Sequence, residues 1–161
     1  MSLNVIPAPN KVELHGGEIS AAELPIEYVT DEGFGEEKYV LDIQKNKAVI
    51  ISKGAKDRYY AEKTYMKLAE KGSLPLCKIT DEPAFSYRGF MIDSARHMQT
   101  IDEIKRYILA AAEFKLNVFH WHLCDDQGWR IECESYPELI KVGAYRDCHG
   151  FRSQDAREYG G

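Results

Sequence analysis

Residues 117–130 read Asn-Val-Phe-His-Trp-His-Leu-Cys-Asp-Asp-Gln-Gly-Trp-Arg, and this stretch decides the fold. A short run of β-forming residues carries His120 and His122 at alternate positions, so the two side chains are expected on the same face of a strand. The run then enters a turn that holds two carboxylates, a glycine, a tryptophan and an arginine. A strand that delivers polar side chains into a loop is typical of α/β enzymes, which build their sites at strand ends.

The segments on either side of this stretch predict a strand–helix–strand unit. Residues 88–94 are interpreted as a buried strand, and residues 116–122 as the next strand. Between them, Thr100-Ile101-Asp102-Glu103 matches a capping box, and apolar residues at helical spacing continue from there to Lys115. A unit of this length joins two parallel strands through a right-handed crossover.

The first half of the chain shows a different pattern. Short strand-like runs are separated by turn signals, and a helix is predicted over 56–71, with Gly72 just past its end. The predicted strands cover 11–14, 26–30, 38–42, 48–52 and 76–80. These elements predict a small α+β domain in which one helix packs on an antiparallel sheet. Asp81-Glu82-Pro83 marks the expected boundary between a first domain, 1–83, and a second, 84–161.

Composition narrows the class of protein. The 161 residues are 44% hydrophobic and 29% charged with a net charge of −5, which indicates a globular protein and argues against disorder. The chain has no Lys/Arg block and no apolar run of about 20 residues, so neither nucleic acid nor a membrane is expected as a partner. No apolar leader follows Met1, which favours a cytoplasmic location, while a removed leader would leave an extracellular one open. The four cysteines (77, 124, 133 and 148) lack C-x-x-C spacing and are interpreted as free thiols.

Two polar clusters follow the two predicted strands of the second half. The first covers residues 93–97 and the second covers residues 120–129. Because the carboxyl ends of parallel strands meet at one edge of a sheet, we expect the clusters to be neighbours in space. Arg96 offers a planar fork of donors that suits sugar hydroxyls or a carboxylate. The structural alternatives are an ion pair between Arg96 and Asp93, and histidines that merely belong to the core.

Specific motifs in both clusters resemble a known family. Residues 87–97, Tyr-Arg-Gly-Phe-Met-Ile-Asp-Ser-Ala-Arg-His, resemble the opening of the catalytic domain of glycoside hydrolase family 20, the β-N-acetylhexosaminidases. Residues 115–130 resemble the family's second-strand signature, and residues 136–139 and 143–145 match in order and spacing. The resemblance implies an α/β fold: the family's small α+β front domain, then the first βαβ part of a (β/α)8 TIM barrel.

The resemblance also implies a function and roles for two residues. Family members remove terminal N-acetylglucosamine or N-acetylgalactosamine from glycans by a retaining mechanism in which the substrate's own acetamido oxygen attacks the anomeric carbon. Arg96 matches the arginine that binds the 3- and 4-hydroxyls of the terminal sugar, and Asp125 matches an aspartate that supports the catalytic acid through a histidine of a later strand. No cofactor and no metal ion are implied.

The family's main catalytic pair has no match in this sequence. The acid glutamate and the aspartate before it belong to later strands, and none of the three Asp-Glu dipeptides, at 31–32, 81–82 and 102–103, stands in a matching context. From Ser86 to Gly161 there are 76 residues, whereas such a barrel needs about 250. The chain is therefore expected to be an amino-terminal piece of an enzyme, inactive by itself. Its unpaired strand edges also predict self-association.

Two further classes of function stay open from the sequence. A metal-dependent barrel hydrolase would use His120 and His122 as ligands, together with Asp125 or His97. A module without enzymatic activity would bind carbohydrate or protein through the first domain.

Overall fold

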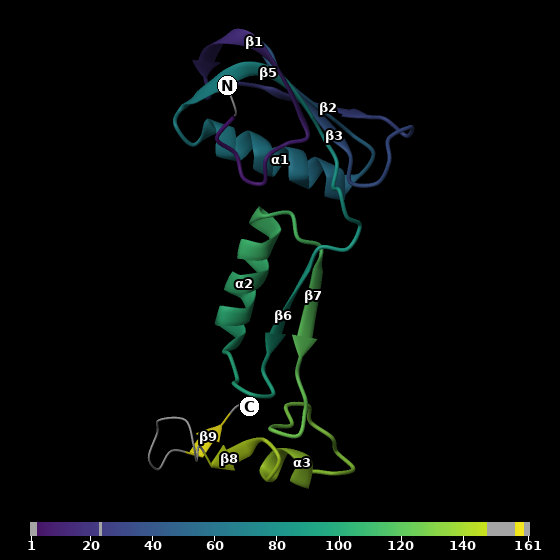
Figure 1. The fold of residues 1–161 in the computed structure, drawn as a ribbon, viewed down its shortest axis with the longest axis vertical. Coiled ribbons are helices and arrows are strands. Elements are labelled where there is room, and N and C mark those ends of the chain that lie inside the picture. The colour runs from purple at the N-terminus through teal and green to yellow at the C-terminus, as the bar shows by residue number, and fades with distance from the viewer. Residues whose placement is uncertain (1–2, 23, 148–156, 160–161) are drawn as a thin grey trace. The chain divides into compact units, whose positions relative to one another are not determined.

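The computed structural model describes residues 3–22, 24–147 and 157–159. The chain divides into two compact units, Met1–Ser86 and Tyr87–Gly161. Each unit has its own sheet and its own long helix, and both are drawn in Figure 1.

The first unit is built on a five-stranded sheet. The strands are β1 (Lys11–Ser20), β2 (Ile26–Thr30), β3 (Tyr39–Ile43), β4 (Ala48–Ser52) and β5 (Ser73–Asp81), in the order β1-β5-β3-β4-β2. Helix α1 (Ala55–Ala69) connects β4 to β5. The predicted strands and helix are therefore confirmed, although β1 is longer than expected because a register shift between Leu14 and Glu18 lets it continue past two glycines.

The prediction of an antiparallel sheet is wrong for one strand. The pairs β1–β5, β3–β5 and β3–β4 are antiparallel, but β2 runs parallel to β4, with Ile26 opposite Ala48 and Thr30 opposite Ser52. A tight turn, in which the Gln44 N–H donates to the Lys47 carbonyl at 2.9 Å, joins β3 directly to β4. This hairpin places β3 and β4 side by side, so β2 takes the far side of β4 and the sheet is mixed.

The core of the first unit lies between the sheet and α1. The buried side chains alternate along the strands and meet one face of the helix. They include Leu41, Ile43, Ile50, Leu74 and Ile79 from the sheet and Tyr60 and Ala61 from α1. Burial raises the pKa of the Cys77 thiol in this core to about 11, so that thiol stays protonated at neutral pH.

The second unit begins with the predicted strand–helix–strand pattern. Strand β6 (Gly89–Asp93) pairs in parallel with β7 (Val118–His122), and α2 (Ile101–Glu113) connects them and runs the opposite way in Figure 1. The capping box is confirmed: the Thr100 hydroxyl accepts from the Glu103 N–H at 3.2 Å, and the Glu103 carboxylate accepts from the Thr100 N–H at 2.8 Å.

The two faces of the β6–β7 pair differ. Phe90 stacks on Phe119 with ring centroids 5.0 Å apart, and Trp121 continues this half-buried aromatic row. On the other face Met91 and His120 are exposed. The interpretation of residues 88–94 as a buried strand is therefore wrong for this unit, because a single helix covers only one face of a pair of strands.

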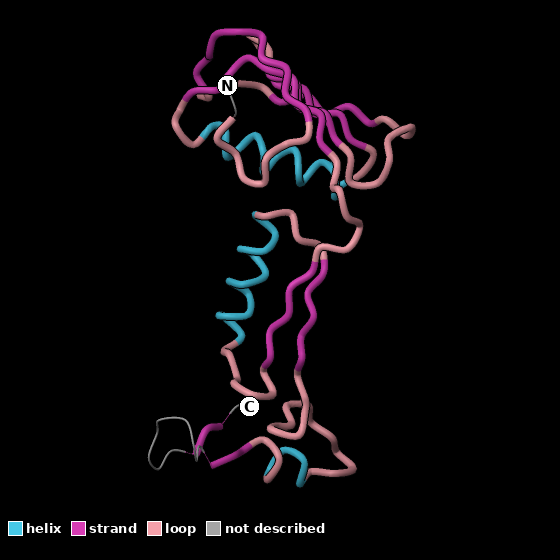
Figure 2. The backbone as a smooth tube through the Cα atoms, in the orientation of Figure 1, coloured by secondary structure: helices cyan, strands magenta, loops and turns pink. Residues whose placement is uncertain are grey.

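Short elements follow β7. They are helix α3 (Glu138–Lys141) and strand β8 (Tyr145–Asp147), which pairs antiparallel with β9 (Arg157–Tyr159), as the tube in Figure 2 traces. Cys77, Cys124 and Cys133 are free thiols, as predicted, and Cys148 lies outside the described residues. Among the described helices, none has the length and apolar character needed to cross a membrane.

Candidate functional site

The ends of β6 and β7 meet where the two polar clusters of the sequence begin. Asp93 is the register partner of His122. Beyond that pair, the backbone N–H groups of Ser94 and Ala95 both donate to the His122 carbonyl, at 2.9 and 3.3 Å. The expectation that the two clusters lie next to each other is confirmed.

Arg96 links the two clusters. Its backbone N–H donates to Asp93 Oδ1 at 3.0 Å, and its Nη1 group is ion-paired with Asp93 Oδ2. Its Nη2 group donates to Asp125 Oδ2 at 3.2 Å. The Arg96 side chain keeps 53% of its surface accessible, so the guanidinium is anchored at two points and still faces solvent. The ion pair with Asp93 that was considered as a structural alternative is present, together with a second carboxylate.

Asp125 is held by a short turn and by a histidine. The backbone N–H of Asp126 donates to Asp125 Oδ1 at 2.8 Å, and His122 Nε2 lies 2.9 Å from Asp125 Oδ2. These two hydrogen bonds, followed by the charge of Arg96, hold the pKa of Asp125 below its ordinary value. The hydrogen bond from Arg96 does the same to the pKa of Asp93. Both carboxylates are therefore ionised at neutral pH.

The turn that carries Asp125 is fixed by its own backbone and by Arg130. Asp125 and Gly128 exchange backbone hydrogen bonds of 3.1 and 3.2 Å. The Arg130 guanidinium donates to three backbone carbonyls: those of Ser94 at 3.0 Å, Ala95 at 3.2 Å and Ala144 at 2.5 Å. Sequence reasoning did not assign this role to Arg130, because its three acceptors are carbonyls that every residue carries, and no side-chain pattern marks them.

Gly128 gives a test of this packing. A Cβ atom at this position would lie 2.6 Å from Arg130 Nη2 and 2.7 Å from the Ala95 carbonyl oxygen. We expect Gly128→Ala to lower the free energy of unfolding by about 1–3 kcal/mol, because the Ala95 backbone cannot move aside freely. Thermal melts measure this, and Gly35→Ala is the control, because no atom lies within 4 Å of a Cβ there. Equal melting temperatures for the two variants would contradict the packing described.

Ser94 and Trp121 form a second contact between the strand ends that the sequence did not indicate. The Trp121 Nε1–H donates to the buried Ser94 hydroxyl at 2.7 Å, and that hydroxyl donates to Gln99 Oε1 at 2.7 Å. Each polar group of this half-buried pair is thereby satisfied. The contact supports the loop that leads from β6 to Arg96.

The remaining candidate residues are His120, Trp129 and His97. The His120 ring is 6.2 Å from the His122 ring on the exposed face of β7, which confirms that the two histidines share a face. Trp129 is half-buried and donates from Nε1 to the Ile131 carbonyl. His97 is exposed. Within the described residues, no three His, Cys, Asp or Glu side chains are placed to hold a metal ion, so the metal-dependent alternative lacks its ligand set.

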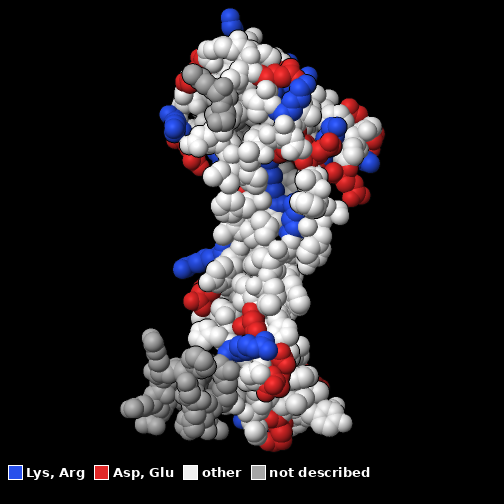
Figure 3. All heavy atoms as spheres, in the orientation of Figure 1, with Lys and Arg blue, Asp and Glu red and all other residues white. Residues whose placement is uncertain are grey.

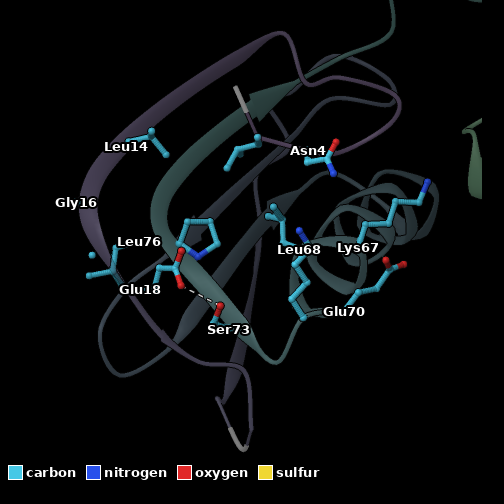
Figure 4. Close-up of a pocket in the computed structure, with 13 residues that line it drawn as sticks. Asn4, Leu14, Gly16, Glu18, Lys67, Leu68, Glu70, Ser73 and Leu76 are labelled. Carbon is cyan, nitrogen blue, oxygen red and sulfur yellow. Dashed lines mark hydrogen bonds between the residues drawn. The ribbon is translucent and has the colours of Figure 1, made fainter. Parts of the chain in front are cut away.

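The first unit has a groove of its own. Its volume is about 570 Å³, and it lies between the curved β1–β5 pair and the end of α1, as Figure 4 shows. Its lining includes Leu14, Glu18, Lys67, Leu68 and Leu76. Glu18 accepts a hydrogen bond of 2.9 Å from the Ser73 hydroxyl there. On the face shown in Figure 3, acidic and basic side chains of this unit are interspersed.

Known proteins are similar in sequence or structure to both units of the chain. Residues 85–160 match the sequence pattern of "Glycosyl hydrolase family 20, catalytic domain". The β-hexosaminidase of Porphyromonas gingivalis is 44% identical over 122 residues, covering 69% of this chain, and that of Vibrio furnissii is 51% identical over 73 residues, covering 45%. A solved exo-β-N-acetylglucosaminidase of family 20 from Vibrio harveyi, in complex with N-acetylglucosamine, is 27% identical and superimposes on 97% of the chain with a TM-score of 0.84. The match spans 16% and 12% of the two curated relatives and 32% of the solved chain.

Proposed function

Because the chain belongs to glycosyl hydrolase family 20, we propose that it is part of a retaining β-N-acetylhexosaminidase that removes terminal N-acetylglucosamine or N-acetylgalactosamine from glycans. In this proposal residues 84–161 begin the catalytic (β/α)8 barrel, and residues 1–83 form the domain in front of it. The parallel β6–α2–β7 unit supports the barrel assignment, because it is the repeating element of that fold.

The observation that carries the proposal is the pairing of Arg96 with Asp125 at the carboxyl ends of two parallel strands. Barrel enzymes place their active sites at this end of the strands. Arg96 is assigned to the hydroxyls of the terminal sugar, for which its exposed, anchored guanidinium is suited. Asp125 is assigned a supporting role toward the catalytic acid, because its carboxylate is ionised and lies at the same strand ends as Arg96.

The mechanism proposed is substrate-assisted, with the acetamido oxygen of the substrate as the nucleophile. It requires an acid and a group that orients the acetamide. The three Asp-Glu dipeptides of this chain do not supply them in the described structure: residues 31–32 begin the connection after β2, Asp81 ends β5, and residues 102–103 form the first turn of α2. The main acid is therefore assigned to a part of the enzyme other than this chain.

A hybrid enzyme tests the proposal. The segment of the Porphyromonas gingivalis β-hexosaminidase that aligns with this chain is replaced by the corresponding residues of this chain, so that the relative supplies the rest of the catalytic domain. We expect the purified hybrid to hydrolyse a chromogenic N-acetylglucosaminide. A hybrid that is folded by thermal melting and circular dichroism, yet turns over no substrate, would contradict the proposed function.

Asp125→Asn in the hybrid tests the supporting role. The exchange keeps the shape of the side chain but removes its charge, so kcat should fall more than KM changes. A carboxylate raises the pKa of an acid that it supports, so its removal should shift the alkaline limb of the kcat profile to lower pH. Asp102→Asn, at an exposed position in α2, is the matched control. A loss confined to KM, with an unchanged pH profile, would assign Asp125 to binding instead.

The groove of the first unit supports a second candidate, a module that binds carbohydrate or protein. Its mixed apolar and charged lining suits a ligand with both kinds of group. Titration of the complete chain with N-acetylglucosamine oligosaccharides, followed by amide NMR, distinguishes the candidates. Shifts confined to the groove would favour the module, and shifts around Arg96 would favour the proposed enzyme.

A further inference from the structure

Two carboxylates hold Arg96 at three points. Asp93 uses both of its carboxylate oxygens on it, one for the backbone N–H and one for Nη1. Asp125 takes Nη2 on the other side. Two carboxylates, one at the end of β6 and one in the turn after β7, thus fix both the main chain and the plane of the guanidinium, which a single exposed ion pair would not do.

The same arrangement determines the charge that a ligand meets. Arg96 lies between two ionised carboxylates, and the charge of Asp126 also acts on it. An anionic ligand at Arg96 would have to approach these carboxylates closely, and like charges at contact oppose binding. An uncharged hydroxyl accepts a hydrogen bond from the guanidinium without this repulsion. The cluster is therefore suited to a neutral polyol rather than to sulfate, phosphate or a carboxylate.

We propose that Asp93 is a positioning residue that orients Arg96 toward uncharged hydroxyls of the terminal sugar, and that the sugar bound there carries no anionic group on those hydroxyls. This inference rests on the proposed function and deepens it, because it names the residue that prepares the sugar subsite and the class of sugar accepted. Asp93 acts through Arg96 and is not assigned a contact with the substrate.

Side-chain NMR of the complete 161-residue chain tests the positioning. In the unaltered chain we expect separate resonances for the two Nη groups of Arg96, because two ion pairs oppose rotation of the guanidinium. Asp93→Asn should merge them, since the amide has lost the charge and offers one acceptor oxygen where Asp93 uses two, one for the backbone N–H and one for Nη1. Asp126→Asn is the matched control, because it also removes one negative charge near Arg96 but leaves both ion pairs in place. Resonances that stay separate in Asp93→Asn, or merge equally in both variants, would overturn the positioning role.

Inorganic sulfate is the probe for the charge preference. Added to the same chain, it should cause no saturable shift of the Arg96 resonances. A saturable shift at Arg96 would overturn the selection of uncharged groups. Amide spectra and thermal melts recorded on each variant show whether the second unit stays folded. If Asp93→Asn does not stay folded, Asp93→Glu, which keeps the charge, provides a second variant.

Kinetics of the hybrid enzyme connect the positioning to the reaction. Asp93→Asn should lower kcat/KM about tenfold or more, the effect of losing an oriented charge-assisted hydrogen bond, whereas Asp126→Asn should change it by about twofold or less. Equal effects of the two variants would overturn the inference. An unaltered hybrid without activity would contradict the proposed function alone, because the NMR measurements on the complete chain still decide the role of Asp93.

Discussion

The 161-residue chain by itself is expected to release no nitrophenol from a chromogenic N-acetylglucosaminide above the rate in buffer. General acid catalysis contributes roughly 10²–10⁴-fold, and positioning of the substrate contributes more, so an enzyme part without the acid has too little left to detect. The expectation rests on the places of the Asp-Glu dipeptides, which lie in the connection after β2, at the end of β5 and in the first turn of α2.

The assay needs a positive control and a criterion for contamination. The hybrid enzyme, assayed at the same molar concentration, supplies the control. Turnover by the chain alone would contradict the prediction if it scales with the purified chain and disappears in Arg96→Ala, because a contaminating hexosaminidase would not respond to that substitution.

Arg96→Ala in the hybrid enzyme should reduce kcat/KM about ten- to a hundred-fold, because a hydrogen bond to a charged group is worth about 1.5–3 kcal/mol and each hydroxyl released adds to the loss. The loss should be larger than that for Asp93→Asn, since the alanine removes the donor itself rather than its orientation. Arg106→Ala, at an exposed position of α2, removes the same kind of side chain away from the site and should leave kcat/KM unchanged.

Stability measurements separate this role from a structural one. Arg96 is exposed and its ion pairs are open to solvent, so their loss should change the melting temperature little. Arg96→Ala that melts several degrees lower but retains unaltered kinetics per folded molecule would show that the residue is a structural ion pair and that the site assignment is wrong.

The local elements of this fold could be predicted from the sequence because their signals are local. The Thr100–Glu103 capping box and Gly72, which adopts a φ of +78° just past α1, are decided by a few neighbouring residues. The direction of β2 could not be predicted in this way. The residue types of this short, mostly exposed strand do not specify its direction, and the partner β4 is selected by how the β3–β4 hairpin occupies the sheet.

The same distinction between local and non-local signals applies to the residues of the site. Arg96 and Asp125 could be proposed from the sequence because their spacing from two strands and a family motif indicate them, and the Arg96 Nη2 group lies 3.2 Å from Asp125 Oδ2. His122 and Arg130 were not given their observed partners. Their contacts depend on the register of β6 against β7 and on the path of the following loops, which residue types alone do not specify.

Arg130 has a consequence for which substitutions this chain can accept. In the described part of the chain, the segments that it joins, after β6 and before β8, are not paired as strands, and one side chain links them by binding three carbonyls. A planar guanidinium reaches three acceptors in fixed directions, whereas a lysine ammonium is a point charge on a flexible stem. Replacing Arg130 by lysine would therefore keep the charge but lose the geometry. Position 130 tolerates less variation than its place in a loop suggests.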